Sequence, residues 1–363
     1  MRTAFPTALA GLAMYAFPAV SVYAQTQYTV RILDTPGLLG GNVSSINNGV
    51  AGGWAYTNCT GLPNCVIQQI PFSWPDGITP VNLTEGSNNI QLSSQIQAAQ
   101  PGLFGGWETD GAAKHAILIG ADGKTDLNGI FFGSQVLALC SGYQAGLAQT
   151  TPLQNGSGSS QRIIWHAMLW SGDALSWTDL HNQQDISQVQ ACDGNVQVGF
   201  AGSGTQTHAV MWTGARTSEV DLHSGPSQSD QATAVSGNLQ AGWGVFPDKA
   251  KNQFTHAVIW HGAPNTMTDI NPPAFSNSAI FGAAGNKQVG YAVVGNDPVA
   301  PGTYHGLLWF GTAASAIDLN QFLPAGYSDA QIDAIDPVTG IIAGAAKGIK
   351  GVFEPALWIP VTQ

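Results

Sequence analysis

The chain repeats one short unit seven times, and this repetition constrains its fold more than any other feature. Five copies begin with a His-Ala or His-Gly step followed by apolar residues, and the steps from His to His are 51, 42, 48 and 49 residues. Two degenerate copies flank them. A period of this length is typical of propeller blades and of solenoids. The copies begin at His115, His166, His208, His256 and His305, with the degenerate ones at Pro71 and Pro355.

Each unit contains four short segments with the character of β-strands. An alternating Ser/Ala/Val/Ile run comes first, and a Gly-aromatic segment such as Gly242-Trp243 follows it. The His-Ala segment is third, and Asp-Leu or a related pair, such as Asp221-Leu222, is fourth. Gly, Asn and Asp turns between short alternating strands are typical of antiparallel sheets. Four such strands per unit form a propeller blade. The sequence therefore predicts an all-β, seven-bladed β-propeller of four-stranded antiparallel blades.

The last unit has only three of the four strands, and the missing one is found near the N-terminus. Residues Tyr28–Leu33 have the pattern of a fourth strand without a blade. A strand from residues 25–40 would complete the last blade and close the ring, which removes its open edges. A solenoid would instead need capping repeats at both ends. We place the blades at 41–84, 85–128, 129–182, 183–224, 225–273, 274–326 and 327–363, all within one domain of residues 25–363.

The first 24 residues have the pattern of a signal peptide. Arg2 precedes an apolar stretch that ends in Val22-Tyr23-Ala24, a small-x-small cleavage site. The alternative is a transmembrane anchor, but the run is short and contains Pro6 and Pro18. We expect cleavage after Ala24, a secreted or periplasmic protein, and no membrane span elsewhere.

Four cysteines would then lie in a compartment that permits disulfides. Cys59 and Cys65 share one Gly/Pro/Asn loop, which suits a local disulfide, and their spacing does not resemble a zinc knuckle. Cys140 and Cys192 follow equivalent first strands of adjacent units. Parity leaves these two cysteines to form the second disulfide.

The charge balance excludes one class of partner. Only 9% of the residues are charged, and 22 acidic residues against 11 basic ones give a net charge of −11. No cationic patch for nucleic acid can arise from this composition. The sequence also lacks a phosphate-binding loop, a nucleophile elbow and a metal-ligand pattern. We expect a monomer with no cofactor and no metal.

The repeated units resemble the extracellular HAF repeat, a family named for its His-Ala-Phe tripeptide. In this chain the tripeptides are His-Ala-Ile, His-Ala-Met, His-Ala-Val twice and His-Gly-Leu. The resemblance covers nearly the whole chain after residue 24. It implies an extracellular repeat protein, and it carries no activity or catalytic residue to this sequence.

The repeated His and Asp residues resemble catalytic pairs, but we interpret them as structural. A Gly-containing turn separates each His from its Asp, so the two should face each other across neighbouring strands. An Asp–His pair could also serve a nucleophile or a metal. However, an enzyme site is not normally repeated five times around a ring, so we predict buried hydrogen bonds that fasten each blade. The pairs are His115/Asp126, His166/Asp179, His208/Asp221, His256/Asp269 and His305/Asp318, whereas Pro71/Asn82 and Pro355/Arg31 replace them in the degenerate units.

The repeated aromatic residues follow the same logic. One aromatic position per unit follows the glycine of the second strand, and another ends the third strand. A residue that recurs at the blade period is better explained by packing between blades than by stacking on a sugar. The third-strand set is Trp74, Trp170, Trp212, Trp260, Trp309 and Trp358.

Function is expected where the repeat breaks. The loops between second and third strands are long and differ from one another, and variable loops on a rigid scaffold commonly bind ligands. We predict a ligand on the face that carries these loops and the fourth-to-first-strand connections. Its candidate residues are Tyr56, Arg162, Trp165, His181, His223 and Tyr304. Because Asn128, Asn271 and Asn320 occupy the register of His181 and His223, these two histidines also fit the role of turn residues.

Two classes of function remain open from the sequence. The first is a secreted propeller that binds or scaffolds a glycan or a protein. The second is a carbohydrate-active enzyme, either a polysaccharide lyase or a hydrolase, on the same face. A hydrolase needs two carboxyl groups at a suitable separation, and the long loops offer few. A lyase could use His181 or His223 with Tyr304 as base and acid, although only fold analogy supports this.

Overall fold

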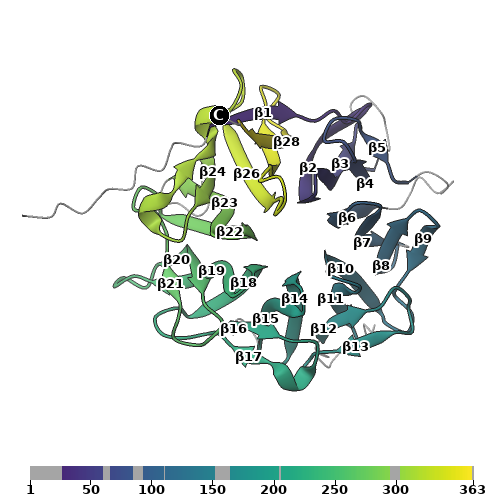
Figure 1. Cartoon of the computed structure of the whole chain (residues 1–363), viewed down its shortest axis with the longest axis vertical. Coiled ribbons are helices and arrows are strands. Elements are labelled where there is room, and N and C mark those ends of the chain that lie inside the picture. Colours follow the sequence, from purple (N-terminus) through teal and green to yellow (C-terminus); the bar gives the residue numbers. More distant parts are fainter. Residues whose placement is uncertain are drawn as a thin grey trace, which may run out of the picture.

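The computed structural model shows a ring of seven four-stranded antiparallel sheets around a central opening (Figure 1). It describes residues 27–59, 66–84, 93–109, 111–151, 164–203, 206–294 and 303–361. The predicted signal peptide, Cys65 and Arg162 lie outside these residues. The predicted seven-bladed propeller is therefore confirmed.

Each blade runs from an inner strand at the opening to an outer strand at the rim (Figure 1). Blade 1 contains β2 (Leu38–Asn47), β3 (Val50–Thr57), β4 (Gln69–Trp74) and β5 (Val81–Asn82); blade 2 contains β6 (Ser94–Gln100), β7 (Leu103–Thr109), β8 (Lys114–Gly120) and β9 (Gly123–Asp126). Blade 3 contains β10 (Gly133–Leu139), β11 (Gln144–Gln149), β12 (Trp165–Trp170) and β13 (Trp177–Asp179); blade 4 contains β14 (Ile186–Asp193), β15 (Val196–Ser203), β16 (Gln206–Trp212) and β17 (Val220–Asp221). Blade 5 contains β18 (Ser229–Ser236), β19 (Leu239–Pro247), β20 (Gln253–Trp260) and β21 (Thr268–Asp269); blade 6 contains β22 (Asn277–Ala284), β23 (Lys287–Val294), β24 (Thr303–Trp309) and β25 (Ile317–Asp318).

Blade 7 joins the two ends of the chain. Its order is β1-β28-β27-β26, with β26 (Asp329–Ile335), β27 (Ile342–Lys347) and β28 (Phe353–Pro360) from the C-terminal end. The outer strand β1 (Tyr28–Ile32) pairs antiparallel with β28, from Tyr28 opposite Pro360 to Ile32 opposite Ala356. The N-terminal strand therefore completes the last blade, as predicted. Within the described ranges, helix is confined to short 3-10 turns, η1 (Arg216–Ser218), η2 (Ala313–Ser315) and η3 (Leu319–Phe322).

The hydrophobic core lies between neighbouring blades. One cluster, for example, joins Val198 and Leu222 of the blade 4 segment to Val258 and Trp260 of blade 5. The tryptophan at or near the end of the third strand is fully buried in six blades. The predicted packing role of this repeated aromatic position agrees with its complete burial.

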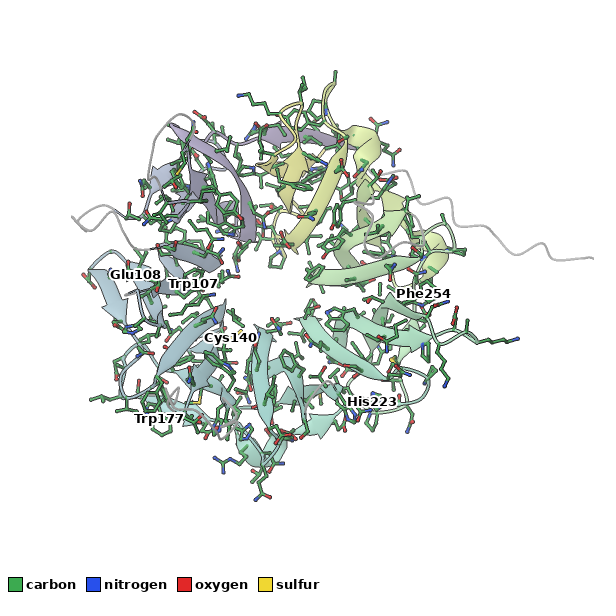
Figure 2. The ribbon with its side chains drawn as sticks, turned by 180° about the vertical axis from the view of Figure 1, so that it is seen from behind. Trp107, Glu108, Cys140, Trp177, His223 and Phe254 are labelled. Atoms are coloured by element: carbon green, nitrogen blue, oxygen red, sulfur yellow. A yellow bond between two sulfur atoms is a disulfide. The ribbon has the colours of Figure 1, made fainter. Side chains whose placement is uncertain are left out.

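A disulfide links the inner strands of blades 3 and 4. Cys140 and Cys192 are bonded, their Cα atoms are 5.8 Å apart, and 52 residues separate them in sequence. Figure 2 shows Cys140 beside the central opening, whereas Trp177 and His223 lie towards the outer rim. Cys59 is also disulfide-bonded, and its predicted partner Cys65 lies outside the described residues.

Removal of the Cys140–Cys192 disulfide should lower stability measurably. A crosslink that closes a loop of this length restricts the unfolded chain, and a typical contribution is about 2–4 kcal/mol. We expect the Cys140→Ser/Cys192→Ser variant to unfold at correspondingly lower denaturant concentration. A peptide map under non-reducing conditions should show the peptides of Cys140 and Cys192 joined. Free thiols at both positions in the natural protein would contradict the pairing.

Candidate functional site

The five predicted His–Asp pairs are hydrogen-bonded, but their geometry differs from the prediction in two respects. The Nδ1–Oδ2 distances range from 2.6 Å in His305–Asp318 to 3.0 Å in His115–Asp126. Each Asp lies opposite the residue two places beyond its His, as Met168 lies opposite Asp179, so the pair reaches diagonally between strands. The pairs are also not buried, because the histidine side chains are 17–39% exposed and the aspartates 20–55%.

The two degenerate blades lack the His–Asp pair. Their strand register also shows that the sequence alignment of these two blades was wrong by one residue. The third-strand tryptophan lies four residues after the histidine in blades 3 to 6. In blade 7 this spacing places Glu354, and not Pro355, at the histidine position. The residue two places further, Ala356, lies opposite Ile32, so Ile32 occupies the aspartate position. Arg31 lies opposite Leu357 instead. In blade 1 the corresponding positions hold Ile70 and Asn82.

The two histidines predicted for binding belong to contacts between blades. The imidazole of His181 is buried, stacks on His166 at 3.9 Å between ring centroids, and its Nδ1 lies 2.8 Å from Ser187 Oγ. Ser187 in turn accepts the backbone N–H of Ala167 at 2.9 Å. Burial, with a smaller contribution from His166, lowers the pKa of His181.

The next blade junction repeats this arrangement with an aspartate. His223 stacks on His208 at 4.0 Å, and its Nδ1 lies 2.6 Å from Asp230 Oδ2. The other oxygen of Asp230 accepts the backbone N–H of Ala209 at 2.6 Å. These contacts favour the interpretation of both histidines as turn residues that join blades.

The remaining predicted binding residues are spread around the ring. Tyr56 of blade 1 is 37% exposed, Trp165 begins the third strand of blade 3, and Tyr304 lies in blade 6. Among the described residues no contact joins Tyr304 to His181 or His223, so the acid–base arrangement considered for a lyase is not assembled. Arg162 lies outside the described residues, and binding by this loop face stays a prediction.

A cavity of about 680 Å³ occupies the central channel, and sequence reasoning did not find it. Its lining comes from the inner strands of all seven blades, from Trp54 and Trp243 of two second strands, and from the turns that follow the inner strands, such as Ser141. These turns lie on the face opposite the long loops, because an inner strand begins at the loop face and ends at the other. The cavity therefore extends from mid-channel towards the turn face.

A β-bulge in every inner strand shapes this cavity. The register between inner and second strands shifts by one residue at the same position in all seven blades. A bulge inserts one extra residue, bends its strand and redirects the side chain. All seven extra residues line the cavity and are half-buried. They are Ser44, Gln97, Leu137, Gln190, Thr233, Phe281 and Asp333.

A repeated glycine makes each bulge possible. The second strand carries a glycine opposite the inner strand, such as Gly106 or Gly290, and a Cβ atom there would lie 1.8–2.1 Å from an inner-strand carbonyl oxygen. No side chain fits at that distance, so the position requires glycine. The glycine that the sequence repeats in the second strands is therefore the residue that accompanies each bulge. The equivalent glycines are Gly53, Gly106, Gly146, Gly199, Gly242, Gly290 and Gly344.

The lining is polar, neutral in most places, and partly aromatic. Seven of its side chains are amides, two are carboxylates, Asp193 and Asp333, and none is basic. The aromatic members are Trp54, Trp243 and Phe281. Amides both donate and accept hydrogen bonds, and aromatic rings offer apolar faces. Such a wall suits a ligand with many hydroxyl groups.

Two of the predicted tyrosines pack against aromatic residues of the cavity lining, one directly and the other through Tyr291. Tyr56 contacts Trp54 edge-on at 4.8 Å between ring centroids. Tyr304 contacts Tyr291 edge-on at 5.5 Å, and Tyr291 stacks on Phe281 at 5.1 Å. The tyrosines themselves do not line the cavity, so they position channel residues.

Asp333 is the unusual charged group of the cavity. Its Oδ2 accepts a hydrogen bond of 2.6 Å from Asn42 Nδ2. Desolvation by the surrounding protein raises the pKa of Asp333 to about 6, and the bond from Asn42 opposes this shift. The carboxyl is half-buried on the channel wall, so some channel water still reaches it.

Ionisation of Asp333 should destabilise the folded protein. Because its folded pKa is raised above the unfolded value of about 3.9, the native state binds more protons between these values. Its stabilising contribution is complete below about pH 4 and is lost as pH rises through about 6. Above about pH 6 we therefore expect Asp333→Asn to be more stable than the natural protein. The expected difference is on the order of 1 kcal/mol, because solvent screening in the channel reduces the effect. Unfolding curves of both proteins across this range would measure the difference, and parallel pH profiles would contradict it.

Among the described residues, no group of three or more His, Cys, Asp or Glu side chains could hold a metal ion. No helix in the described ranges has the length and apolar character needed to cross a bilayer. Neither statement concerns the residues outside those ranges.

Comparison with known proteins supports the fold and nothing finer. No family model and no curated protein sequence matches the chain. The chain is similar to the β-propeller domain of the Trilobed protease from Pyrococcus furiosus, with 7% identity, a TM-score of 0.55, and coverage of 88% of this chain and 94% of that one. It is also similar to Pyrococcus horikoshii acylaminoacyl peptidase, with 9% identity, a TM-score of 0.56, and coverage of 92% and 54%. That protease domain is described as having an open velcro topology, whereas β1 here completes blade 7.

Proposed function

We propose that the protein is a secreted, non-catalytic β-propeller that binds a glycan in its central channel. The single observation that carries this proposal is the set of seven bulge residues. These differ from blade to blade, while the glycine that pairs with the residue before each bulge is repeated. A specific site requires groups that the ring does not repeat. The disulfide between Cys140 and Cys192 supports secretion, and an extracellular HAF-type repeat agrees with it.

The chemistry of the lining supports a sugar over other ligands. Amide side chains such as Gln97 and Gln190 can exchange hydrogen bonds with hydroxyl groups, and Trp54 and Trp243 can pack against sugar rings. A net charge of −11 and a lining without basic residues disfavour polyanions. The cavity volume of about 680 Å³ lies within the range of small-molecule sites.

Filling the channel is the experiment that tests this proposal. The protein beginning at Gln25 is screened on a panel of neutral, acidic and amino glycans, and each hit is measured against Gln190→Trp. The larger side chain occupies channel space, so affinity should fall at least about tenfold. The matched control is Leu175→Trp, because Leu175 is 81% exposed at the outer rim.

A third variant distinguishes the loop face from the channel. Arg162→Ala/Trp165→Ala removes two residues that the sequence predicts for the loop face, and neither belongs to the channel lining. Binding that survives Gln190→Trp but is lost in this variant would move the site to the loops. Binding to no glycan on the panel would contradict the proposed function.

A further inference from the structure

One side of the channel cavity holds hydrogen-bond acceptors without matching donors. Asp333 is the bulge residue of blade 7, and within the described residues its hydrogen-bond donor is Asn42 of blade 1. The other polar atom of Asn42, Oδ1, is buried and has no partner in the part of the chain that the structure describes. An unpaired buried acceptor is costly, and an unpaired carboxylate more so. This side of the cavity therefore lacks donors that a ligand could supply.

No protein cation faces this carboxylate from the cavity wall. The residues that line the cavity include no Lys, Arg or His. The second acidic residue of the lining, Asp193, already accepts the backbone N–H of Gly237 at 2.7 Å. Asp193 is also exposed, whereas Asp333 is half-buried, so Asp333 is the acidic group of the lining that has less access to water.

Aromatic rings from the two neighbouring blades flank the carboxylate. Phe281 lines the cavity from blade 6 and stacks on Tyr291. Tyr291 is near enough to Asp333 that the carboxylate charge contributes, after burial, to a Tyr291 pKa of about 12. Trp54 lines the cavity from blade 1, opposite Asn42 in the register. Aromatic faces attract cations, so both neighbours of the carboxylate favour positive charge.

We propose that Asp333, Asn42 and the aromatic residues beside them form a subsite for a protonated amine on the bound sugar, so that the preferred ligands contain an amino-sugar unit. The inference rests on the proposed channel function and narrows its ligand class. An ammonium group carries three N–H donors and one positive charge. It supplies donors for the half-buried Asp333 carboxylate, which Asn42 holds in place, and the overall acidic charge of the protein attracts it.

Two probes with the same sugar skeleton test this subsite. The dimer of chitin carries N-acetyl groups, and its fully deacetylated form carries free amines. Isothermal titration near neutral pH is expected to show at least about tenfold tighter binding of the deacetylated dimer. Asp333→Asn keeps the shape and the side-chain amide contact at this position but removes the charge, so the variant should bind the two dimers with equal affinity and lose the preference. The matched control Asp193→Asn removes one negative charge from the same cavity and should retain the preference.

The outcomes separate this inference from the proposed function. Equal affinity of the natural protein for both dimers, or a preference that persists in Asp333→Asn, would overturn the amine subsite and leave channel binding intact. Failure of both dimers to bind, while another glycan binds and is blocked by Gln190→Trp, would also overturn it alone. A preference for the amine that Gln190→Trp does not weaken would contradict channel binding itself.

Discussion

Deletion of residues 25–34 is expected to abolish cooperative folding of the whole ring. The deletion removes β1, which buries Tyr28, and the following Leu33, which is 4% exposed. It also removes the backbone bonds from Leu33 N to Pro355 O and from Val361 N to Gln27 O, at 2.8 and 2.9 Å. Burial of each large side chain contributes about 1.5–3 kcal/mol, so the total approaches the 5–15 kcal/mol that stabilises a whole protein.

The unpaired edge of β28 adds a second consequence. An exposed strand edge pairs readily with other chains, so the truncated protein should aggregate as well as unfold. Calorimetry of a protein beginning at Gln25 and one beginning at Thr35 would measure the loss. The control Thr29→Ala changes an exposed side chain of β1 and should shift stability by less than about 0.5 kcal/mol. An unchanged melting temperature after deletion would show that β1 does not close the ring.

Substitution of Asp230 by Ala is expected to cost about 3–5 kcal/mol. Asp230 is completely buried and accepts three hydrogen bonds of 2.6 Å, from Ala209 N, His223 Nδ1 and Ser227 Oγ. Alanine would leave the backbone N–H of Ala209 buried without a partner. Denaturant unfolding of the variant would measure the loss of stability.

A serine at the same position provides the matched control. Ser187 and Ser278 occupy the corresponding place at two other blade junctions and accept the N–H of Ala167 and Ala257. Asp230→Ser should therefore keep part of the network and cost clearly less than Asp230→Ala. If both variants unfolded like the natural protein, the proposed fastening of blades by these residues would be wrong.

The fold could be predicted from the sequence because the same pattern of residues recurs in successive blades. A histidine, an alanine and an aspartate recur at the blade period, and each occupies the same place in the ring, as the buried Ala116, Ala167, Ala209 and Ala257 show. The orphan strand at Tyr28–Leu33 indicated the closure for the same reason. Blades 1 and 7 were each misaligned by one residue because proline was equated with histidine. The distance to the terminal tryptophan, which was also in the sequence, gives the register.

The candidate site could not be predicted in the same way. A side chain's face follows from strand alternation, and a bulge shifts that alternation by one residue. Asp333 and Gln190 therefore line the channel only because their strands are bulged. The glycine of the second strand could have indicated the bulges, but a close approach between two backbones has no signature that distinguishes it from an ordinary turn glycine. Non-repeated loops drew attention to Tyr56 and Tyr304, which do not line the cavity. Tyr56 contacts the lining residue Trp54, and Tyr304 contacts Tyr291.

A crystal structure of the protein soaked with the deacetylated chitin dimer would test the central claim most directly. The channel account predicts that the sugar lies among the bulge residues, with an amine nitrogen within hydrogen-bond distance of the Asp333 carboxylate and a ring against Phe281 or Trp54. A sugar bound on the loop face beside Trp165, with the channel free of sugar, would contradict the account.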